Sequence, residues 1–250
     1  MITGRRILIL GGTTEARELA GELAGRGFAV RISLAGRTAQ IRDQGVPVRV
    51  GGFGGAAGLA EYLVREGVAA LIDATHPYAA VMSQHAAEAA RAAGVPLLAL
   101  HRPAWTPGAG DRWREVANVE QAVAALGTEP RRVFLALGRK ELEAFAAAPQ
   151  HAYLVRSVDP VDPPLGVPRA VYVTARGPFD EADERRLLEQ HAIEHLVCRN
   201  SGGPAAQGKL AAARALGIPV LLIRRPPLPD VPAVSSPAEV VAWLAHAPSR

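Results

Sequence analysis

The sequence contains few of the residues on which disulfide-rich, metal-binding or membrane-spanning proteins depend. Its 250 residues include one cysteine, Cys198, and aromatic residues make up only 5% of the chain. A single cysteine excludes a disulfide framework and a site of several cysteines, and the histidines do not stand at ligand spacing, so we predict no metal site. No apolar run approaches the roughly 20 residues of a membrane-spanning helix, and the chain begins directly with a strand pattern. We therefore expect a cytoplasmic protein without a signal peptide or membrane partner.

Positive charge is only slightly in excess and is not concentrated in any segment. Lys and Arg total 28 against 24 Asp and Glu, which gives a formal net charge of +4. The arginines are spread along the chain, whereas a nucleic-acid surface usually needs a concentrated basic stripe, so we expect no nucleic-acid partner. Guanidinium groups pair with carboxylates and phosphates in a bidentate way, which favours a small anionic ligand. A coding bias toward Arg, Ala and Gly would give the same composition.

The strongest local pattern stands near the start of the chain. Residues 7–10 are all apolar, which is typical of a strand buried on both faces of a parallel sheet. Two glycines follow and allow a tight turn, and two threonines can then cap the start of a helix. A strand, a glycine turn and a helix N-terminus together form an anion site, where the pyrophosphate of a dinucleotide would bind. The residues that we assign to this cofactor site are Gly11, Gly12, Thr13, Thr14 and Glu15.

This turn departs from the usual dinucleotide fingerprint G-x-G-x-x-G/A. The three positions hold Gly11, Thr13 and Ala16, so threonine replaces the middle glycine. The Thr13 hydroxyl could offset that loss by contacting phosphate, although its side chain crowds the turn. An ordinary junction between a strand and a helix is the alternative interpretation of the same residues.

The end of the expected second strand, residues 28–34, bears on which dinucleotide is bound. An acidic residue at this place would hold the ribose of NAD, whereas NADP needs a small residue and a cation for its extra phosphate. No Asp or Glu lies between Val30 and Gln40, while Ser33 and Arg37 are well placed. The sequence therefore favours NADP, with a solvated loop charge as the alternative role of Arg37.

The third strand, expected over residues 46–50, leads into the loop GGFGG at 51–55. Four glycines around one phenylalanine cost too much entropy for a loop without a role. Either the backbone approaches a ligand closely or the loop has to flex. We assign Gly52 and Phe53 to the cofactor site.

The fourth strand, expected over residues 69–72, ends in the segment DATHPYA at 73–79. Ligands bind at the carboxyl ends of parallel strands, so we expect this segment at the same edge as the glycine turn. Thr75, His76 and Tyr78 place three hydrogen-bonding side chains there, and Pro77 fixes the turn. A structural or capping histidine is the alternative interpretation of His76.

The second half of the chain repeats the alternation of strands and helices. Further strands are expected over residues 132–137, 151–158, 170–174, 195–198 and 219–223, and a terminal helix begins at Ser236. The pattern predicts an α/β protein with two Rossmann-like, doubly wound parallel-sheet lobes and an active site in the cleft between them. We expect an NADP-binding domain over residues 1–128 and a second, substrate-binding α/β domain over residues 129–250.

Seven stretches of the sequence also match one enzyme family in order along the chain. They are LILGGTTEAR at 8–17, SLAGR at 33–37, GGFGG at 51–55, DATHPYA at 73–79, LALGRKELEAF at 135–145, ARGPF at 175–179 and NSGG at 200–203. With these motifs the chain resembles the precorrin-6A reductases of the cobalamin (corrin) pathway. The departure that stands out is Arg199 before NSGG, where lysine is common in the family, so the positive charge is retained.

The resemblance implies a reduction of one macrocycle double bond of precorrin-6A by NADPH, which gives precorrin-6B. It implies a cofactor lobe at the N-terminus and a C-terminal lobe that helps to enclose the tetrapyrrole, whose acetate and propionate groups suit arginine and lysine. His76 and Tyr78 are the candidate catalytic residues, as proton donors, and Thr75 also belongs to the cofactor site. The residues expected to bind substrate are Thr75, His76, Pro77, Tyr78, Gly138, Arg139, Arg176, Arg199, Asn200, Ser201, Gly202, Gly203 and Lys209.

Several points stay open at this stage. The proton could also come from solvent or from a substrate carboxyl group. A reductase of another small anionic substrate and a dinucleotide sensor without enzymatic activity are the two other interpretations of the chain. The sequence is compatible with a monomer or a small homo-oligomer.

Overall fold

The computed structural model describes residues 4–36 and 42–246, which form two compact units. Unit 1 comprises the described residues up to Pro103 together with those from Pro226 onward, and unit 2 is Ala104–Arg225. This division differs from the predicted boundary between residues 128 and 129. The chain therefore passes from one unit to the other twice rather than once.

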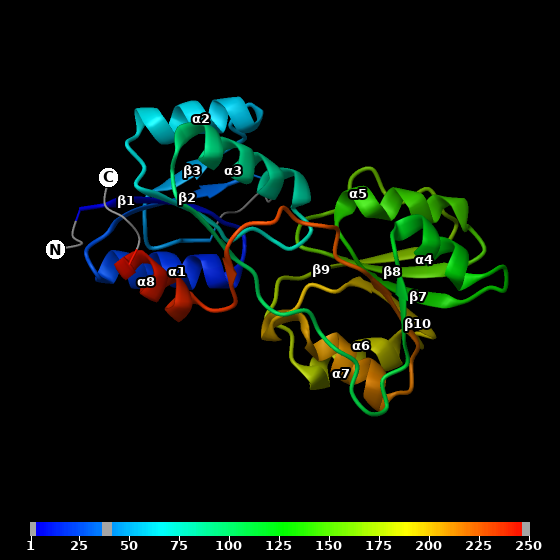
Figure 1. Ribbon diagram of the computed structural model, residues 1–250. Helices are drawn as coiled ribbons and strands as arrows, with labels where there is room; N and C mark the ends of the chain where they lie inside the picture. Colours follow the sequence, from blue (N-terminus) through cyan, green and yellow to red (C-terminus); the bar gives the residue numbers. More distant parts are fainter. Residues whose placement is uncertain (1–3, 37–41, 247–250) are drawn as a thin grey trace. The chain divides into compact units, whose positions relative to one another are not determined.

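Unit 1 is a parallel α/β sheet covered by helices on both faces. Its elements are β1 (Arg6–Leu10), α1 (Thr14–Gly25), β2 (Ala29–Leu34), β3 (Val48–Val50), α2 (Gly55–Arg65), β4 (Ala70–Asp73), α3 (Ala80–Ala93), β5 (Leu97–Leu100), β12 (Ala233–Val234) and α8 (Pro237–His246). The strand order is β12-β5-β4-β1-β2-β3, and each pairing is parallel. In Figure 1, α1 (blue) and α8 (red) lie on one face of this sheet, and α2 and α3 lie on the other.

Unit 2 has the same kind of sheet. Its elements are β6 (Trp113–Val116), α4 (Val119–Leu126), β7 (Arg132–Ala136), α5 (Arg139–Leu142), the 3-10 helix η1 (Glu143–Ala147), β8 (Ala152–Ser157), β9 (Ala170–Thr174), α6 (Glu181–Gln190), β10 (His195–Arg199), the 3-10 helix η2 (Pro204–Ala206), α7 (Gly208–Ala215) and β11 (Val220–Ile223). The strand order is β6-β11-β10-β7-β8-β9, again with parallel pairing throughout. The predicted fold class, two doubly wound parallel-sheet lobes, is therefore confirmed.

The sixth strand of each sheet explains why the predicted boundary differs from the observed one. β6 pairs with β11 of unit 2 although it precedes the remaining strands of that sheet. β12, of only two residues, pairs with β5 of unit 1 although it follows all of unit 2. Because β12 is so short and follows a proline-rich segment, its apolar pattern is too weak to be predicted.

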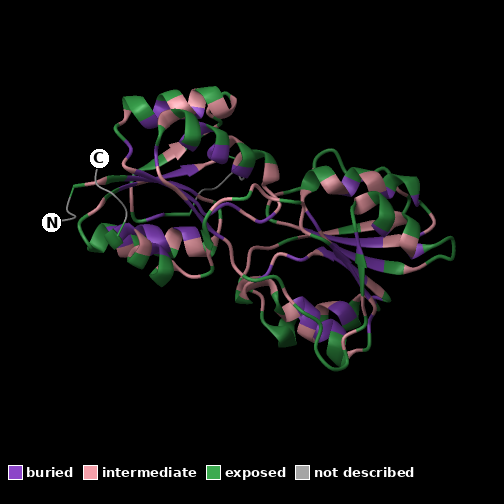
Figure 2. Cartoon of the chain, viewed as in Figure 1, coloured by how far each residue is buried: buried purple, intermediate pink, exposed green. Residues whose placement is uncertain are grey.

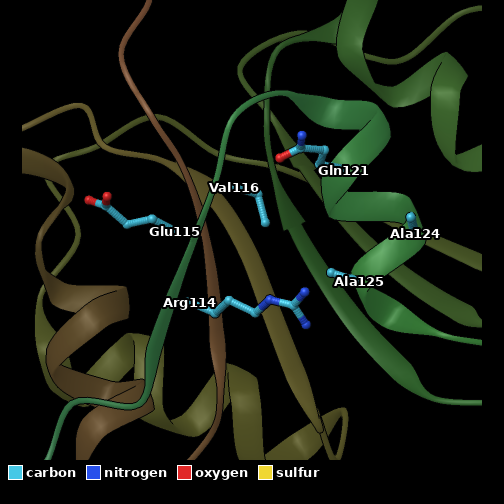
Figure 3. Close-up of a pocket in the computed structure, with 6 residues that line it drawn as sticks. All are labelled: Arg114, Glu115, Val116, Gln121, Ala124 and Ala125. Carbon is cyan, nitrogen blue, oxygen red and sulfur yellow. The ribbon is translucent and has the colours of Figure 1, made fainter.

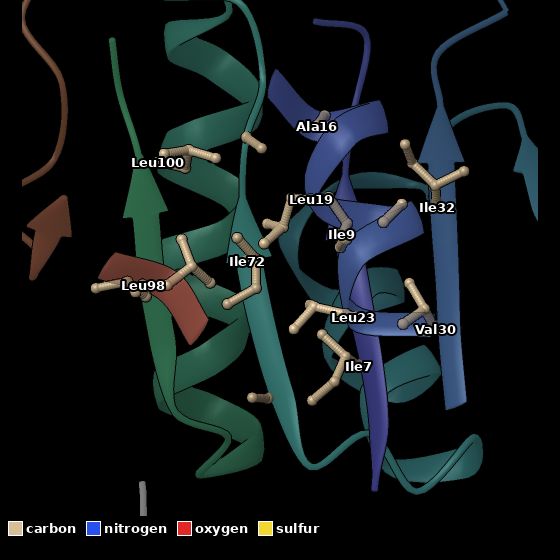
Figure 4. Close-up of a cluster of buried hydrophobic side chains, with 14 of the residues drawn as sticks. Ile7, Ile9, Ala16, Leu19, Leu23, Val30, Ile32, Ile72, Leu98 and Leu100 are labelled. Carbon is tan, nitrogen blue, oxygen red and sulfur yellow. The ribbon is translucent and has the colours of Figure 1, made fainter. Parts of the chain in front are cut away.

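The apolar residues of the strands pack against helices on both faces, as the continuous apolar runs predict. In unit 1, Ile7 and Ile9 of β1 pack with Leu19 and Leu23 of α1 (Figure 4), whereas Leu8 and Leu10 belong to the cluster under α2 and α3. In unit 2, a cluster that contains Phe134 and Leu196 packs against α6 and α7. Figure 2 shows buried residues concentrated in the strands of both sheets. This alternation along each strand fixes which side chains face which helix layer.

A buried ion pair crosses from the sheet of unit 2 to its helix layer. The Arg156 guanidinium on β8 binds the carboxylate of Glu184 on α6, and the two side chains are 7% and 3% exposed. The guanidinium carbon lies 4.9 Å from the ring centre of Phe134 and 3.8 Å from that of Phe179. Among the described residues, Glu184 Oε2 is buried without a hydrogen bond. Neither partner can therefore be removed without leaving a charge in an apolar layer.

Two histidines lie at the amino ends of central strands in unit 2. His151 directly precedes β8 and is fully buried, and His195 is the first residue of β10. Desolvation, with a smaller contribution from the Arg131 charge, lowers the pKa of both His151 and His195. Both imidazoles are therefore held in the neutral form more strongly than in the unfolded chain.

Replacing Arg156 with Met should lower the free energy of unfolding by about 3–5 kcal/mol, because Glu184 would be left buried without its partner. The matched control is Arg185→Met on α6, the helix of Glu184; its pair with Glu189 is exposed and contributes at most about 1 kcal/mol. Guanidinium unfolding followed by circular dichroism measures both. Equal midpoints for the two variants would contradict the assigned role of the buried pair, and Arg156→Met with Glu184→Leu should recover most of the loss.

The stability of unit 2 should fall as the pH drops below about 6.5, the usual pKa of histidine. Because both folded-state pKa values lie below the unfolded value, the unfolded chain binds more protons in this range and is favoured by acid. Urea midpoints measured between pH 7.5 and pH 5.5 test this. In the double variant His151→Gln with His195→Gln, the urea midpoint should depend less on pH. His246→Gln, whose imidazole is exposed on α8, is the control and should keep the pH dependence of the unmodified protein. An unchanged pH dependence in the double variant would refute the assignment.

Candidate active site

The carboxyl edge of the unit 1 sheet contains a point where the strand order reverses. From β1 the chain continues to β2 on one side, while β4 and β5 lie on the other. The loops that follow the two strands at such a point diverge, and doubly wound proteins bind ligands in the crevice between them. Residues 11–15 follow β1 and residues 74–79 follow β4. The structure therefore brings together the two loops that the sequence assigns to a site.

Gly11 and Gly12 are glycines for different physical reasons. A Cβ atom on Gly11 would lie 2.6 Å from Ile32 Cδ1, so the packing of β2 against the turn excludes a side chain. Gly12 has open space around it but a φ of +118°, which side chains rarely tolerate. Together they turn the chain from β1 into α1 within a few residues, so that the first amides of α1 open onto the crevice.

Thr13, in the place of the middle glycine, connects the two loops. Its Oγ1 accepts a hydrogen bond from Ala16 N at 3.1 Å and so caps α1. The same hydroxyl donates to the Ala74 carbonyl at 2.9 Å, in the loop after β4. The threonine therefore contributes a link that glycine cannot make, and the predicted contact of this hydroxyl with phosphate stays a prediction.

The start of the loop after β4 is ordered by a buried carboxylate. Asp73 is 2% exposed, and its Oδ1 accepts hydrogen bonds from Thr75 N at 3.1 Å and from Thr75 Oγ1 at 2.7 Å. Asp73 Oδ2 lies 4.0 Å from Nε2 of His101, the residue after β5. The Thr75 side chain thereby has one orientation, directed into the unit and toward Ser83 on α3.

His76 and Tyr78 lie together on the next turn. The Tyr78 amide donates to His76 Nδ1 at 3.3 Å, and the two rings are 5.6 Å apart between centres. Because Nδ1 acts as an acceptor, the proton of the neutral imidazole is on Nε2. Pro77 between them is buried. The arrangement orients the His76 ring with Nδ1 toward the Tyr78 amide.

A small pocket lies on the β4 and β5 side of the same crevice. The side chains that line it are Thr13, Glu15, Thr75, Pro77, Leu100 and Arg102. Arg102 and Glu15 form an ion pair across it, with 2.9 Å between Nη1 and Oε2. Arg102 was not assigned to the site from the sequence, because its partner stands 87 residues earlier.

The predicted adenosine end of the site contains an arginine that the sequence analysis did not single out. Ser33 on β2 pairs in register with Arg49 on β3. The Arg49 guanidinium donates to the carbonyls of Gly51 and Gly52 at 2.5 and 2.7 Å and lies 3.7 Å from the centre of the Phe53 ring. Arg49 therefore holds the glycine-rich loop in one conformation. Arg37, predicted at this place, lies outside the described residues.

The carboxyl edge of unit 2 has its own reversal point, between β7 and β10. Gly138 follows β7, and Arg199 ends β10. Arg199 forms two contacts with Glu141, from Nε to Oε1 at 2.7 Å and from Nη2 to Oε2 at 2.5 Å. A Cβ atom on Gly138 would lie 3.2 Å from both groups, so glycine leaves room for the pair. The positive charge predicted at Arg199 is thus balanced by a carboxylate that the sequence analysis did not assign to a role.

The NSGG loop is fixed by the segment that leads into unit 2. The Asn200 side chain accepts from Trp105 N at 2.8 Å and donates to Trp105 O at 2.9 Å, and Trp105 Nε1 donates to Gly203 O at 3.0 Å. Arg225 donates to the carbonyls of Asn200 and Ser201. Asn200 is 5% exposed. Its amide therefore holds the loop in place, with Gly202 and Gly203 both at positive φ.

The remaining predicted cations of unit 2 differ in exposure. Arg139 is exposed and donates to the Pro160 carbonyl at 3.2 Å, and Arg176 is half-buried in the loop after β9. Lys209 is buried: its ammonium donates to the Ala206 carbonyl and lies 5.0 Å from the centre of the Trp105 ring. The structure thus gives Lys209 local partners within unit 2. Its predicted contact with substrate stays a prediction.

A second pocket, which lies in unit 2 and has a volume of about 300 Å³, contains none of the predicted residues. It lies between β6 and α4 and is lined by Arg114, Glu115, Val116, Gln121, Ala124 and Ala125. Figure 3 shows the Arg114 side chain directed toward Ala125 and the Glu115 side chain directed away from it. Its residues do not bring a pair of reactive groups together. The two strand-order reversals therefore remain the candidates for the active site.

Two general features of the described chain bear on the predictions. Within residues 4–36 and 42–246, no three or more His, Cys, Asp or Glu side chains are grouped so that they could hold a metal ion. Across the same residues, none of the helices combines the length and apolar character needed to cross a bilayer.

Comparison with known proteins identifies relatives over nearly the whole chain. Residues 6–245 match the family model described as precorrin-6x reductase CbiJ/CobK. The chain is 55% identical to the precorrin-6A reductase of Sinorhizobium sp. over 96% of this chain and 93% of that protein, and 52% identical to that of Rhodobacter capsulatus over 96% of each. A solved structure of CobK precorrin-6A reductase is 51% identical, covers 98% of both chains and has a TM-score of 0.94.

Proposed function

Because this chain belongs to the CbiJ/CobK family of precorrin-6x reductases, we propose that it reduces a ring double bond of precorrin-6A to give precorrin-6B, with NADPH as the reductant. Family membership makes it an oxidoreductase of cobalamin biosynthesis. The observation that carries the proposal is the match over residues 6–245, which includes both strand-order reversals. NADPH, when bound, supplies the hydride, and the protein has to position it, bind the tetrapyrrole and provide a proton.

The residues of unit 1 fit a dinucleotide. Gly11 and Gly12 leave no side chain between the crevice and the start of α1, and Thr13 caps Ala16 so that the preceding amides remain available. Those amides and the helix dipole favour a pyrophosphate group. Gly12 to Glu15 would therefore hold the pyrophosphate through their backbone.

The end of β2 fits the additional phosphate of NADPH better than the free ribose of NADH. Ser33 stands where an acidic residue would bind the ribose hydroxyls, and Arg49 lies beside it in register. Two of the five N–H groups of Arg49 bond to the glycine loop, and its charge is not neutralised by these carbonyls. We assign Ser33 and Arg49 to the phosphate, with Gly52 and Phe53 supporting them.

The carboxyl edge of unit 2 fits a substrate with many carboxylates. Arg139 is exposed and donates to the Pro160 carbonyl, Arg176 is half-buried in the loop after β9, and guanidinium groups suit carboxylates through bidentate contacts. Arg199 forms an ion pair with Glu141, and this pair fixes the orientation of the Arg199 guanidinium. Ser201, Gly202 and Gly203 would add hydroxyl and amide donors beside it. We propose that this edge holds the acetate and propionate groups of precorrin-6A.

His76 is the proposed proton donor. Its imidazolium form would give the Nε2 proton to the substrate and return to the neutral ring, whose Nδ1 faces the Tyr78 amide, and solvent would protonate it again. The residue lies beside the pocket whose lining includes Thr75 and Pro77, on the nicotinamide side of a cofactor bound as proposed. Tyr78 supports the ring through its own ring and amide.

The coenzyme assignment predicts a change in preference when Arg49 is replaced. Under anaerobic conditions with precorrin-6A, the protein should oxidise NADPH in preference to NADH. Arg49→Met should lower kcat/KM for NADPH by about 10- to 100-fold and leave that for NADH nearly unchanged, because a charged contact to phosphate is lost. The matched control is Arg65→Met on α2, because the Arg49 and Arg65 guanidinium groups both lie 5.4 Å from the centre of the Tyr62 ring. An equal loss with both coenzymes would restrict Arg49 to loop support, and no NADPH oxidation by the unmodified protein would refute the proposed function.

Replacing His76 with Ala should slow single-turnover reduction by about 100-fold or more, which is the usual contribution of a positioned proton donor. Tyr78→Phe keeps the amide and the ring and should retain most of the rate. The absorbance of NADPH and of the tetrapyrrole, followed together, reports both halves of the reaction. A rate unchanged in His76→Ala would exclude this residue and favour solvent or a substrate carboxyl group as the proton source.

A further inference from the structure

Three side-chain nitrogen atoms at the amino edge of the unit 2 sheet are buried without hydrogen bonds. Among the described residues, Arg131 Nε, His151 Nδ1 and His195 Nδ1 have no partner. Arg131 directly precedes β7, His151 directly precedes β8, and His195 is the first residue of β10. Buried polar nitrogens normally have a partner, because an unpaired one loses its hydrogen bond to water without replacing it. These three atoms are therefore candidates for binding a ligand.

The register of the sheet places the three side chains on one face. Arg131 is two residues before Val133, the residue of β7 that pairs with His195. The pairing of β7 with β8 extends to the residue before each strand, since Ala152 N donates to Arg131 O at 2.8 Å, and so places His151 beside Arg131. Paired residues share a face, and side chains two residues apart in a strand point to the same side. Because β7 lies between β10 and β8, Arg131 belongs to the strand between the two histidines, on their side of the sheet.

Positive charges act on both histidines. Desolvation is the largest cause of the lowered pKa of His151 and of His195, and the Arg131 charge lowers both further. Arg169 acts on His151, and Arg112 and His151 act on His195, in the same direction. A negative charge at this edge would therefore be attracted by every member of the cluster.

One carboxylate lies near the cluster, and it is engaged on the other face of the sheet. Glu194 partly opposes the lowering of the pKa of His195 by its charge. Its Oε2 accepts from Arg132 N at 2.8 Å and lies 3.7 Å from Arg132 Nε. Glu194 and Arg132 each adjoin a member of the cluster in sequence, so their side chains point to the opposite side. Arg131 is half-buried and belongs to none of the ion pairs of the described residues, so its charge is available to a ligand.

The second ring nitrogen of His151 has a carbonyl beside it. Gln150 Nε2 lies 3.3 Å from His151 Nε2 and donates to the Gly127 carbonyl at 3.0 Å. A hydrogen bond to that carbonyl raises the pKa of His151, against the larger effect of desolvation. Since Nδ1 has no partner, this bond belongs to Nε2. A protonated ring would thus donate from Nε2 to Gly127 and from Nδ1 to an anion, and binding of the anion would take up a proton.

We propose that Arg131, His151 and His195 bind a small tetrahedral oxyanion, phosphate or sulfate, at the amino edge of the unit 2 sheet. Arg131 Nε would donate to one oxygen, and Nδ1 of each protonated imidazole would donate to another. A carboxylate has two oxygens and one charge, whereas a tetrahedral oxyanion has an oxygen for each of three donors and a second charge. The site lies at the opposite edge of the sheet from Gly138 and Arg199, so it does not depend on the proposed reaction.

The test follows the imidazole signals of the full chain by NMR while the pH is varied. Sulfate is the probe because it remains a dianion between about pH 5 and pH 8, and chloride at the same ionic strength is the reference. In sulfate the protonation midpoints of His151 and His195 should rise by about 1 pH unit, because the anion favours the charged rings. The midpoint of His246, exposed on α8, should be the same in both salts. The signals are specific to each residue, so sulfate bound at residues 12–15 of unit 1 does not interfere.

Arg131 and its neighbour Arg132 give a matched pair of variants, because their side chains point to opposite faces. At about pH 6, Arg131→Met should weaken sulfate binding by about 10- to 100-fold, since a hydrogen bond from a charged group is lost. Arg132→Met should bind sulfate as the unmodified protein does. Acetate should bind the unmodified protein more weakly than sulfate, because it has one charge and two oxygens.

Three results would overturn the proposal. Equal midpoints of His151 and His195 in sulfate and chloride would do so on the unmodified protein alone, whether or not a variant folds. An equal loss of affinity in Arg131→Met and Arg132→Met would reduce the binding to a general effect of positive charge. Acetate bound as tightly as sulfate would contradict the tetrahedral oxyanion.

Discussion

The hydrogen bond from Thr13 Oγ1 to the Ala74 carbonyl is the interaction on which the site in unit 1 depends. A parallel sheet whose order reverses between two strands leaves a crevice at their carboxyl ends. In this sheet the crevice lies between β1 and β4, and the bond sets the distance between the loops that follow them. The same hydroxyl caps α1, so the position of the helix N-terminus and the position of the loop after β4 are coupled. In the proposed coenzyme site, one side chain therefore links the loop expected at the phosphates to the loop expected at the reacting ring.

The two units share a topology and differ in the residues at the carboxyl edge of the sheet. Unit 1 uses glycines, backbone amides and hydroxyl groups at the reversal, which suits a group held mainly by amide donors. In unit 2, arginines lie at the reversal, and one of them, Arg199, is paired with Glu141. Arginines at this place suit a ligand with several carboxylates. Each sheet receives its sixth strand from a segment separated in sequence from the other five. In unit 1 that strand, β12, holds the end of β5 and so the start of the segment that contains Arg102.

Much of the fold follows from the sequence because buried parallel strands are continuous apolar runs bounded by glycine or polar loops. The strands over 7–10, 70–73 and 132–136 are found within a residue or two of their predicted positions. The two-residue strand β12 and the exchange of domain segments were missed, because two residues contain no periodic signal. The side chains that complete the sites were also missed. Arg102 meets Glu15, and Arg199 meets Glu141, across 87 and 58 residues, and spacing in one sequence does not reveal such pairs. The cleft between the lobes, the domain roles and the ligand contacts stay predictions.

Amide hydrogen exchange of the full chain, with and without NADPH, tests the central claim most directly. The account predicts that NADPH slows exchange in peptides that cover residues 11–16 and 51–55, which hold the coenzyme phosphates. Peptides that cover 138–142 and 200–203 of unit 2 should exchange at the same rate with and without the coenzyme. Slower exchange in the unit 2 peptides alone, with residues 11–16 unchanged, would contradict the account.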